Sequence, residues 1–473
     1  MKKNLFINGN WEDGEKYSEL KSPYSREVIA EIAQATKEQV NKAVDSAQET
    51  FNTMKGLSSF QRSTILDQLV NLLTTNKDKA AEIISLESAK PLKFAISEVD
   101  RTIETYKFAA EEAKRISGEV IPIDAAKNGA NKIGFTIHEP IGVIAAITPF
   151  NFPMNLVAHK VGPAIAAGNT IVLKPASQTP LSAIFLAELL AQTDLPKGAF
   201  NLVTGSGKVV GDALVENEKV KMVTFTGSPE VGKNIKTRAG LKRVSLELGS
   251  NAGLIIDKDV DVDSIIDKCV NAAFSNQGQV CISLQRIYVH EQIIEEFTRK
   301  FKERTDQLVL GDPLDINTDI SALISEGDLS RAKTWIEEAV TEGASLTTGG
   351  TIENQILRPT ILSNVGNTSK VSCQEAFAPV VTVNKISSVD EAIQQINDSI
   401  FGLQAGIFTN NILNASQAIK HLEVGGVIIN DVPTFRVDHM PYGGVKESGN
   451  CREGIKYAIE EMTELKLVVW NHN

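Results

Sequence analysis

One cysteine of this chain stands where a nucleophile could work. Cys281 follows the run Gln277-Gly278-Gln279-Val280, so it lies in a stretch that contains glycine. Glycine lets a substrate carbonyl approach the backbone closely, and a thiol becomes strongly nucleophilic only as its thiolate. An isolated cysteine in a long chain is also commonly a small buried hydrophobic residue. Cys281 is therefore a candidate nucleophile, and its role depends on the groups around it.

Two polar residues could assist such a nucleophile. Glu247 lies in the apolar run 244–248, directly before Gly249. A buried carboxylate either pairs with a cation or has a raised pKa that suits a general base. Asn151 stands between Pro149 and Pro153 after an apolar strand. Its amide either donates to an oxyanion or satisfies its own turn.

Two glycine-containing turns follow predicted strands and open predicted helices. Residues 204–211 carry Gly205, Gly207 and Gly211, and residues 225–232 carry Gly227 and Gly232. The free N–H groups at the start of a helix favour a pyrophosphate. The first turn has neither the spacing of the dinucleotide fingerprint nor that of a P-loop, so it is either a cofactor turn or a tight packing turn. Two such turns close together favour a nucleotide-binding region.

Strands and helices alternate where these turns occur. Short apolar strands are predicted at Val143–Thr148, Thr170–Lys174, Phe200–Val203 and Met222–Phe225, with helices between them. This βαβ rhythm predicts a parallel sheet that is covered on both faces and binds nucleotides at the carboxyl ends of its strands. A second α/β segment begins at Ala252 and carries Cys281, with strands predicted at Gly253–Ile256, Arg286–Val289, near Thr360 and at Val380–Ile386. A cleft is expected between the two halves, near residues 248–253.

The remaining segments flank these two halves. Residues 5–11 and 28–33 predict a small entry sheet with a hairpin at Asn8-Gly9, and helical spacing follows over residues 38–51, 59–76, 79–87 and 96–116. Strands at 131–138 and 465–470 have no obvious local partner. They either pair with each other or with a core sheet, or act as arms at a subunit edge.

Composition excludes several classes of protein. The chain has 473 residues, 48 basic and 59 acidic side chains and a net charge of −11, which argues against binding to nucleic acid or to an anionic membrane. Its four cysteines show no disulfide framework and no metal-ligand spacing, and no apolar run approaches a transmembrane helix. The start of the chain has no apolar signal segment. We expect a cytoplasmic protein without a metal site.

Seven motifs together resemble the aldehyde dehydrogenase superfamily, and the resemblance covers essentially the whole chain. They are Pro149-Phe150-Asn151-Phe152-Pro153, Leu173-Lys174-Pro175, Phe225-Thr226-Gly227-Ser228, Leu246-Glu247-Leu248-Gly249, Gly278-Gln279-Val280-Cys281, Glu375-Ala376-Phe377-Ala378-Pro379 and Tyr442-Gly443-Gly444-Val445-Lys446.

The resemblance implies an α/β fold of three parts. A Rossmann-like parallel-sheet domain of residues 1–118 and 140–249 would bind NAD or NADP, and an α/β domain of residues 250–440 would be catalytic. A small β element of residues 119–139 and 451–473 would bridge subunits of a homodimer or homotetramer. Cys451 stands where the family usually has glycine, and we expect it to be structural.

The resemblance also assigns roles to the candidate residues. Cys281 would attack the aldehyde, Asn151 with the backbone N–H of Cys281 would hold the oxyanion, and Glu247 would activate water. Lys174 would hold the adenine ribose. The full set of cofactor residues implied is Thr148, Pro149, Lys174, Ser177, Gly207, Gly211, Phe225, Gly227, Ser228, Gly249, Glu375 and Phe377.

Ser177 bears on the choice of cofactor. Members that prefer NAD often carry a glutamate at this position, which accepts hydrogen bonds from the 2′-hydroxyl and would repel a 2′-phosphate. A small Ser177 beside Lys174 leaves room and one positive charge. We therefore expect NADP to be accepted, alone or together with NAD.

The expected substrate is a small aldehyde. Arg101, His159, Arg436 and His439 fall in segments that resemble the walls of the substrate tunnel, and the last two resemble the lactaldehyde dehydrogenase-like branch. They suit a hydroxyl, carboxylate, sulfonate or phosphonate. The alternative is structural: Arg101 would pair with a glutamate of its own helix, Glu98 or Glu104, and His439 would cap a turn.

Val280, where arginine would favour phosphorylated aldehydes, points to a short 2-hydroxyaldehyde such as lactaldehyde or an anionic relative such as sulfolactaldehyde. A semialdehyde or an aromatic aldehyde is the alternative substrate within the family. A cysteine hydrolase and a non-catalytic aldehyde-binding homologue are the alternatives from other classes.

Overall fold

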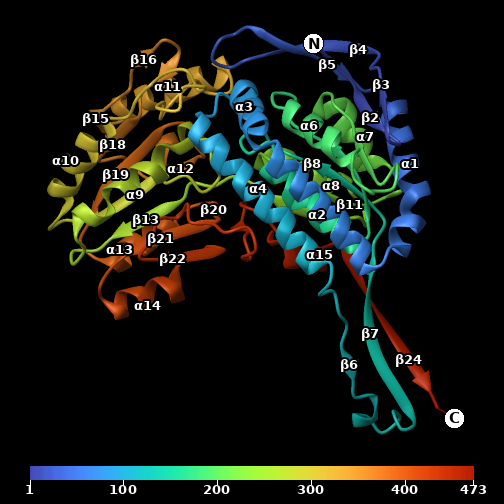
Figure 1. Cartoon of the computed structure of the whole chain (residues 1–473). Helices are drawn as coiled ribbons and strands as arrows, with labels where there is room; N and C mark the ends of the chain where they lie inside the picture. The colour runs from blue at the N-terminus through green and yellow to red at the C-terminus, as the bar shows by residue number, and fades with distance from the viewer. Residues whose placement is uncertain (473) are drawn as a thin grey trace.

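The computed structural model describes residues 1–472, and its first body is built on a seven-stranded sheet (Figure 1). The strand order is β12-β11-β8-β9-β10-β2-β3, and β8 to β12 run parallel. These strands are β2 (Leu5–Ile7), β3 (Asn10–Glu12), β8 (Val143–Ile147), β9 (Thr170–Lys174), β10 (Phe200–Leu202), β11 (Val220–Thr226) and β12 (Arg243–Glu247). The predicted parallel sheet is confirmed.

Alternate residues of these strands enter two different cores. In β8, Val143 and Ala145 join the core on one face, whereas Ile144 and Ala146 join the core on the other. Both faces are therefore covered by helices, as the continuous apolar strands predict. The helices of this body are α1 (Lys37–Gly56), α2 (Ser59–Thr75), α3 (Lys77–Ser88), α4 (Leu92–Glu112), α5 (Asn155–Ala167), α6 (Leu181–Leu190), α7 (Asp212–Glu216) and α8 (Pro229–Arg238), with the π-helical turn η2 (Gly207–Gly211) before α7.

The starts of the first two helices follow from local sequence. Thr36 before α1 accepts a hydrogen bond from the backbone of Gln39, whose side chain accepts one from the backbone of Thr36. Ser58 and Gln61 repeat this reciprocal arrangement at α2. Such capping boxes satisfy N–H groups that a helix start leaves without partners.

The second body holds another seven-stranded sheet, in the order β15-β18-β19-β14-β13-β21-β22, with only β15 antiparallel to its neighbour. Its strands are β13 (Gly253–Ile256), β14 (Arg286–His290), β15 (Ser345–Thr348), β18 (Thr360–Ser363), β19 (Val380–Ile386), β21 (Gln404–Phe408) and β22 (Gly426–Ile429). Its helices are α9 (Val262–Phe274), α10 (Ile294–Thr305), α11 (Glu326–Thr341), α12 (Lys370–Cys373), α13 (Val389–Asn397) and α14 (Ile412–His421). The sequence patterns located the first half of this body but not β21, β22, α13 and α14.

A third sheet projects from the first body as a long ribbon (Figure 1). β24 (Thr463–Asn471) pairs antiparallel with β7 (Lys132–Pro140) over its whole length, and β6 (Val120–Ile121) pairs with the other edge of β7. The two strands without local mates therefore pair with each other. The 3-10 turn η1 (Ile123–Ala125) follows β6, and short ladders elsewhere join β16 (Ile352–Glu353) to β17 (Ile356–Leu357) and β20 (Phe401–Gly402) to β23 (Val445–Lys446).

The N-terminus departs from the predicted entry sheet. The Asn8-Gly9 hairpin forms, but β2 pairs with β10 at the edge of the large sheet instead of with the second predicted strand. That strand, β5 (Val28–Gln34), lies in a separate sheet between β1 (Lys2–Lys3) and β4 (Lys16–Lys21). The side chain of Asn201 on β10 accepts from the Asn8 backbone at 2.9 Å, a contact between distant segments that local pattern cannot show.

The C-terminal segment contributes to two parts of the structure, the first body and the projecting sheet. α15 (Ile455–Glu461) packs on α4 and α5 of the first body, with Ile455 and Ile459 in its core. Only the strand after it joins the projecting sheet.

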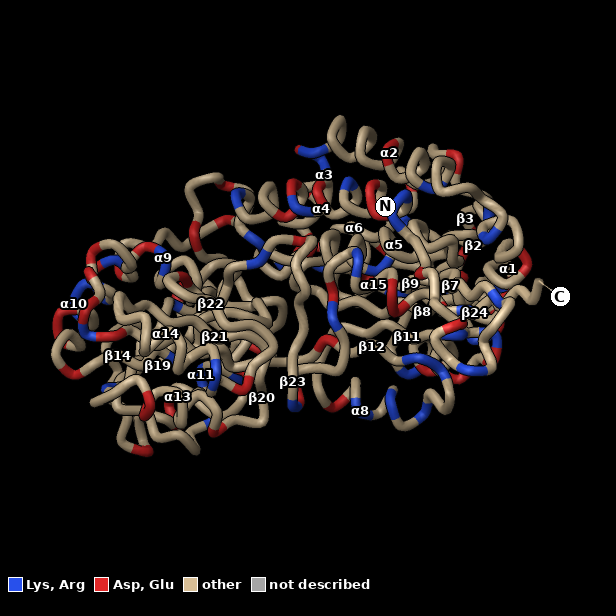
Figure 2. Tube along the Cα trace, turned by 90° about the horizontal axis from the view of Figure 1, so that it is seen from below, with Lys and Arg blue, Asp and Glu red and all other residues tan. Residues whose placement is uncertain are grey.

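Both signs of charge lie along outer helices such as α10 (Figure 2). Within residues 1–472, no helix is long and apolar enough to cross a membrane, and no group of His, Cys, Asp and Glu side chains is placed to hold a metal ion.

Candidate active site

Two cavities meet at Cys281, between the carboxyl ends of the first sheet and the second body. We call the larger one, of about 980 Å³, the cofactor cavity; its lining includes Thr148, Lys174, Gly227, Ser228, Glu375 and Cys281. We call the smaller one, of about 390 Å³, the substrate cavity; its lining includes Arg101, Val280, Cys281, Thr434, Arg436 and Tyr442. The cleft predicted between the two halves is therefore present, and the candidate thiol faces both of its parts.

A strained turn sets the position of Cys281. Asn276, Gln277 and Gly278, at the end of the 3-10 turn η3 (Ser275–Gly278), all have positive φ, of 51°, 57° and 70°. A Cβ on Gly278 would lie 2.2 Å from the carbonyl oxygen of Ala378. The glycine therefore admits another loop of the protein, not a substrate carbonyl as the sequence suggested. Strain of this kind persists only where surrounding contacts enforce it, and the Gln277 amide donates to the carbonyls of Ala89 and Ala322, each at 3.0 Å.

The Cys281 side chain is half-buried, and its thiol has one close polar neighbour. Its Sγ lies 2.8 Å from the hydroxyl of Tyr442. Burial raises the pKa of Cys281 to about 11, while the Tyr442 hydrogen bond and the charge of Arg436 act in the opposite direction. The thiolate thus depends on these two neighbours.

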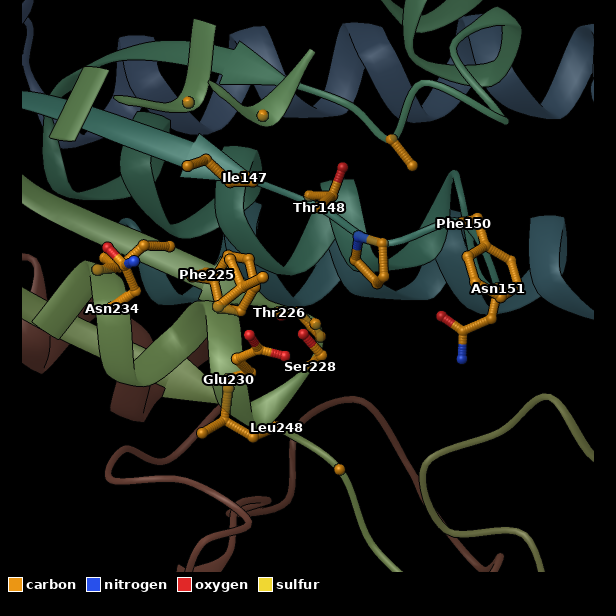
Figure 3. A pocket seen from close by; sticks show the side chains of 18 of the residues that line it. Ile147, Thr148, Phe150, Asn151, Phe225, Thr226, Ser228, Glu230, Asn234 and Leu248 are labelled. Atoms are coloured by element: carbon orange, nitrogen blue, oxygen red, sulfur yellow. The ribbon is translucent and has the colours of Figure 1, made fainter. Parts of the chain in front are cut away.

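Asn151 reaches across the cleft instead of capping its own turn. Its Nδ2 donates to the Gln279 carbonyl at 2.9 Å, and its Oδ1 has no hydrogen-bond partner among the described residues. Figure 3 shows its amide pointing away from the ribbon of its turn. The buried Lys90 donates to the backbone carbonyl of Asn151 at 2.7 Å and forms an ion pair with Glu98. A buried ion pair therefore fixes the turn that carries the amide.

Glu247, at the end of β12, lies behind the wall of the two cavities. It faces a smaller buried space, where its Oε1 accepts a hydrogen bond from the Cys451 thiol at 3.3 Å and its Oε2 has no partner. Burial raises its pKa well above the ordinary range, and the neighbouring Glu453 carboxylate adds to the shift. A carboxyl group in this state can take up a proton near neutral pH.

Arg436, in the wall of the substrate cavity, begins a chain of buried polar groups that lie behind that wall. Arg436 donates through Nη2 to Glu453 at 2.9 Å and contacts the His159 ring nitrogen Nε2 at 3.1 Å. His159 in turn lies 2.8 Å from the Asp438 carboxylate. Arg436 and Glu453 compensate each other's charge, which is the condition for burying charge without a large loss of stability, while Arg436 Nε and His159 Nδ1 have no partner among the described residues.

The four expected substrate residues differ in position. Arg101 forms a two-point hydrogen bond with Asp438, at 2.7 and 3.1 Å, and so does not pair with Glu98 or Glu104. Arg101 and Arg436 line the substrate cavity. His159 is buried behind it, and His439 is exposed with its ring against Phe108, 4.6 Å between centroids. Both histidines therefore lie outside the lining of the substrate cavity.

The start of α8 suits a pyrophosphate. Ser228 stands at the N-cap without a side-chain capping bond, and Pro229 occupies the first helical position. The ring of Phe225 lies over Gly227, where a Cβ would be 2.5 Å from it. The buried hydroxyls of Thr148 and Thr226 have no partner among the described residues. Figure 3 shows Thr226, Ser228 and Glu230 together at this turn, so uncapped N–H groups and unpaired hydroxyls face the cavity that a dinucleotide would enter.

The other side of the cofactor cavity carries Lys174 and the first glycine turn. Lys174 donates to the Pro175 carbonyl at 3.0 Å, and burial lowers its pKa to about 8. Ser177 donates to the Gly205 carbonyl at 3.1 Å. A Cβ on Gly207 would meet nothing within 4 Å, so this glycine leaves open space and does not serve tight packing. Gly207, Gly211 and Pro149 all line the cavity.

Glu375 and Phe377 close the cavity near Cys281. The Glu375 carboxylate accepts from the Ser250 backbone at 3.0 Å, and a Cβ on Gly249 would lie 2.8 Å from it. Burial raises the pKa of Glu375 to about 7. The Phe377 ring meets Phe150 edge to face at 5.7 Å. The glycine at 249 is therefore required by the close approach of this carboxylate.

Sequence reasoning gave no role to several residues of the site. In the sequence Tyr442 stands out only as part of a glycine motif. Its hydroxyl group is the one feature that could have suggested a polar role in the site. Asp438 and Glu453 neutralise the arginines, and Lys90 holds the Asn151 turn. Lys208, Arg331 and Trp335 also line the cofactor cavity. Isolated charged residues in the sequence carry no mark of such pairing, so only the fold identifies them.

Comparison with known proteins decides the family. The model of the aldehyde dehydrogenase family matches residues 11–468. This chain belongs to the aldehyde dehydrogenase family. It is an NAD(P)-dependent oxidoreductase of aldehydes, with the mixed α/β fold of that family.

Three relatives illustrate the similarity. A 3-sulfolactaldehyde dehydrogenase of Priestia megaterium is 47% identical over 467 residues, which are 99% of this chain and 98% of that protein. A lactaldehyde dehydrogenase of Methanococcus maripaludis is 44% identical, over 98% of this chain and 99% of that protein. The crystal structure of a glyceraldehyde-3-phosphate dehydrogenase of Methanocaldococcus jannaschii, complexed with NADP, is 40% identical with a TM-score of 0.93, over 97% of this chain and 100% of that one.

Proposed function

We propose that this aldehyde dehydrogenase oxidises a short 2-hydroxyaldehyde that carries an anionic group, of the sulfolactaldehyde type, or its neutral lactaldehyde counterpart. The observation that carries the proposal is the pair of arginines in the substrate cavity beside Cys281. Arg101 engages Asp438 through Nε and Nη2, and Nη1 has no bond to a described residue. The Nε of Arg436 likewise has no partner there. Guanidinium donors without partners suit a sulfonate or carboxylate.

The names of the relatives point the same way. Proteins 47% and 44% identical to this chain over nearly their whole length are a 3-sulfolactaldehyde and a lactaldehyde dehydrogenase. Both substrates are short aldehydes with a hydroxyl on the neighbouring carbon. The Thr434 side chain lines the same cavity and offers a hydroxyl partner.

In the proposed reaction Cys281 is the nucleophile. Its thiolate attacks the aldehyde carbon to give a thiohemiacetal, whose oxyanion accepts hydrogen bonds from the Asn151 amide and the Cys281 backbone N–H. Bound NAD(P) supplies the acceptor for the hydride that leaves this carbon. The resulting thioester is attacked by water, and Glu247 takes up the proton of that water as the acid is released. Glu247 must turn from its buried position toward the cavity to do so.

The residues of the cofactor cavity have proposed roles as well. Gly227 and Ser228, at the start of α8, hold the pyrophosphate, and Lys174 binds the adenine ribose or its 2′-phosphate. Glu375 and Phe377 contact the nicotinamide ribose. Ser177, small and neutral, leaves room for NADP. The remaining positions, which line or border this cavity, are Thr148, Pro149, Gly207, Gly211, Phe225 and Gly249.

The proposal extends to a homodimer or homotetramer in which the projecting sheet bridges subunits. β7 and β24 expose large apolar side chains to solvent, among them Ile133, Leu465, Leu467, Val469 and Trp470. Apolar groups in such a row are costly in water and are expected at an interface. Light scattering should give a mass of two or four chains, and a purely monomeric protein would contradict this part of the proposal.

A panel of aldehydes tests the substrate. Initial rates with NADP and NAD should be measured on lactaldehyde, sulfolactaldehyde, succinic semialdehyde, benzaldehyde and propanal. We expect kcat/KM for the two hydroxyaldehydes to exceed that for propanal by about tenfold or more, since one satisfied charged hydrogen bond contributes about 1.5–3 kcal/mol. The Arg101→Met variant should lose most of the preference for the sulfonate, whereas Arg115→Met, on an exposed surface, should keep it. Equal rates on propanal would exclude the proposal, and a preference for benzaldehyde or the semialdehyde would favour those substrates instead.

A further inference from the structure

We infer that Tyr442 is a catalytic residue whose hydroxyl donates a hydrogen bond to the Cys281 thiolate, and that Arg436, stacked on its ring, completes an activating unit for the nucleophile. The inference rests on the proposed function of Cys281, and its test has a readout that needs neither aldehyde nor cofactor.

The first observation is a direct contact with the reacting atom. The Tyr442 hydroxyl lies 2.8 Å from the Cys281 Sγ. Both side chains line the substrate cavity, and Tyr442 itself is 2% exposed. A hydroxyl at this distance from a sulfur atom, shielded from water, interacts more strongly than it would at the surface.

The second observation is the position of Arg436. Its guanidinium lies 3.7 Å from the centroid of the Tyr442 ring, which places a positive charge on the ring face. Glu453 holds the guanidinium from the other side, and the Glu453 backbone forms two hydrogen bonds with the Tyr442 backbone, of 3.0 and 2.6 Å. The phenol, the arginine and the carboxylate therefore support one another, and the hydroxyl is held on the sulfur.

Protonation determines the direction of the hydrogen bond. Burial raises the pKa of Tyr442 well above 10, so the phenol keeps its proton where the enzyme works and donates to the thiolate. The proton of the thiol leaves for water, and the phenol keeps its own. Of the other charged groups near Cys281, Arg436 favours the thiolate, while Glu375 and Glu247 oppose it. Tyr442 and Arg436 thus counteract burial and two carboxylates.

Alkylation of Cys281 in the cofactor-free enzyme tests the inference. The rate of reaction with iodoacetamide, followed at Cys281 by mass spectrometry from pH 6.5 to 9.5, reports the fraction of thiolate. In Tyr442→Phe we expect the rate at each pH to fall about tenfold, equivalent to a profile displaced upward by about one pH unit. The same displacement should appear in the pH profile of kcat/KM, so that raising the pH restores part of the activity.

A matched control separates the hydroxyl from general damage to the fold. Tyr288 is also buried, at 1% exposure, and its hydroxyl lies 3.4 Å from Arg286, but it lines neither cavity. Tyr288→Phe should leave the alkylation profile unchanged. Thermal unfolding of both variants should show a similar Tm. If Tyr442→Phe is unfolded, Tyr442→Leu, which also lacks a donor, provides the second test in the same assay and should displace the profile, whereas Tyr442→His, whose neutral ring keeps one N–H donor, should displace it less.

The outcomes are distinct. An alkylation profile of Tyr442→Phe that equals the wild-type profile, or a faster reaction because the smaller side chain opens the site, would overturn the inference. If the alkylation profile of Tyr442→Phe is displaced but the wild-type enzyme oxidises no aldehyde of the panel, the proposed function is refuted. The inferred contact between Tyr442 and the thiolate would then still stand.

Discussion

The cofactor cavity and the substrate cavity share Cys281 but are built from different groups. On the cofactor side the lining combines glycines and aromatic rings with charged side chains, some of them paired, such as Arg238 with Asp212. The buried charges of Lys174 and Glu375, however, have no opposite charge bonded to them. On the substrate side buried charges occur in pairs, Lys90 with Glu98 and Arg101 with Asp438.

The difference teaches how each side achieves selectivity. A buried ion pair holds both partners in one arrangement, because breaking it leaves a charge without compensation. The paired charges of the substrate side are therefore held in place, and in the proposed function they select by charge. On the cofactor side, glycines and uncapped N–H groups fit a phosphate backbone whatever the ribose carries, and in the proposed function the choice between NAD and NADP is left to one side chain, Ser177.

The largest effect is expected at the residue that both cavities share. Cys281→Ala should lower kcat by more than about 10⁴-fold, because loss of a nucleophile removes the covalent step. Binding of NADP, followed by fluorescence, should persist, since the cavity remains. Cys373→Ala, which removes a thiol at the end of α12 that contacts the Thr368 carbonyl, should keep full activity. Substantial turnover of the Cys281→Ala variant would show that Cys281 is not the nucleophile.

Glu247 lies in neither cavity, and its substitution should separate the two half-reactions. Glu247→Gln should give a burst of about one NADPH per active site and then a steady rate about 10²–10⁴-fold lower, because general base catalysis is lost only in hydrolysis. In the wild-type enzyme the rate of hydrolysis should rise with pH as the raised pKa of Glu247 is passed, and in the variant this dependence should disappear. Glu87→Gln removes another buried carboxylate, whose pKa burial raises to about 8, and should not affect turnover.

Two buried lysines, one on each side, test directly whether charge pairing distinguishes the substrate cavity from the cofactor cavity. Lys90→Met on the substrate side leaves Glu98 without its partner and should lower the free energy of unfolding by about 3–5 kcal/mol. Lys174→Met on the cofactor side removes a charge that burial already disfavours, so stability at pH 7 should stay equal or rise. Urea denaturation measures both. Equal losses would mean that charge pairing does not distinguish the two sides.

The smallest effect concerns the choice of cofactor. Ser177→Glu should lower the ratio of kcat/KM for NADP to that for NAD by about 10–100-fold, because the carboxylate repels the 2′-phosphate and one such interaction amounts to about 1.4–2.8 kcal/mol. Ser177→Ala removes only the hydrogen bond to Gly205 and should keep the ratio. An unchanged ratio in the glutamate variant would place the selecting group elsewhere.

The predicted elements that the structure confirms are those with strong periodicity. The parallel strands β8 to β11 and helices α1 to α4 were located within a few residues, because apolar spacing there reflects burial on one face or both. Between residue 386 and the strand predicted at 465–470 no element was assigned, although α13 and β21 are regular, since short elements with mixed composition give weak periodic patterns. The partner of β2 was misassigned because β10 lies far along the chain.

What the sequence determined by itself is the set of chemical parts. Cys281, Glu247, Asn151 and the glycine turn at Gly227 were recognisable from residue type, local spacing and family motifs. The tertiary structure decided what those parts contact: Gly278 faces Ala378, Glu247 is turned toward Cys451, and Tyr442 meets the thiol. The physical reason is that the pKa and donor geometry of a buried group depend on its neighbours in space, and those neighbours lie 100 or more residues away in the chain.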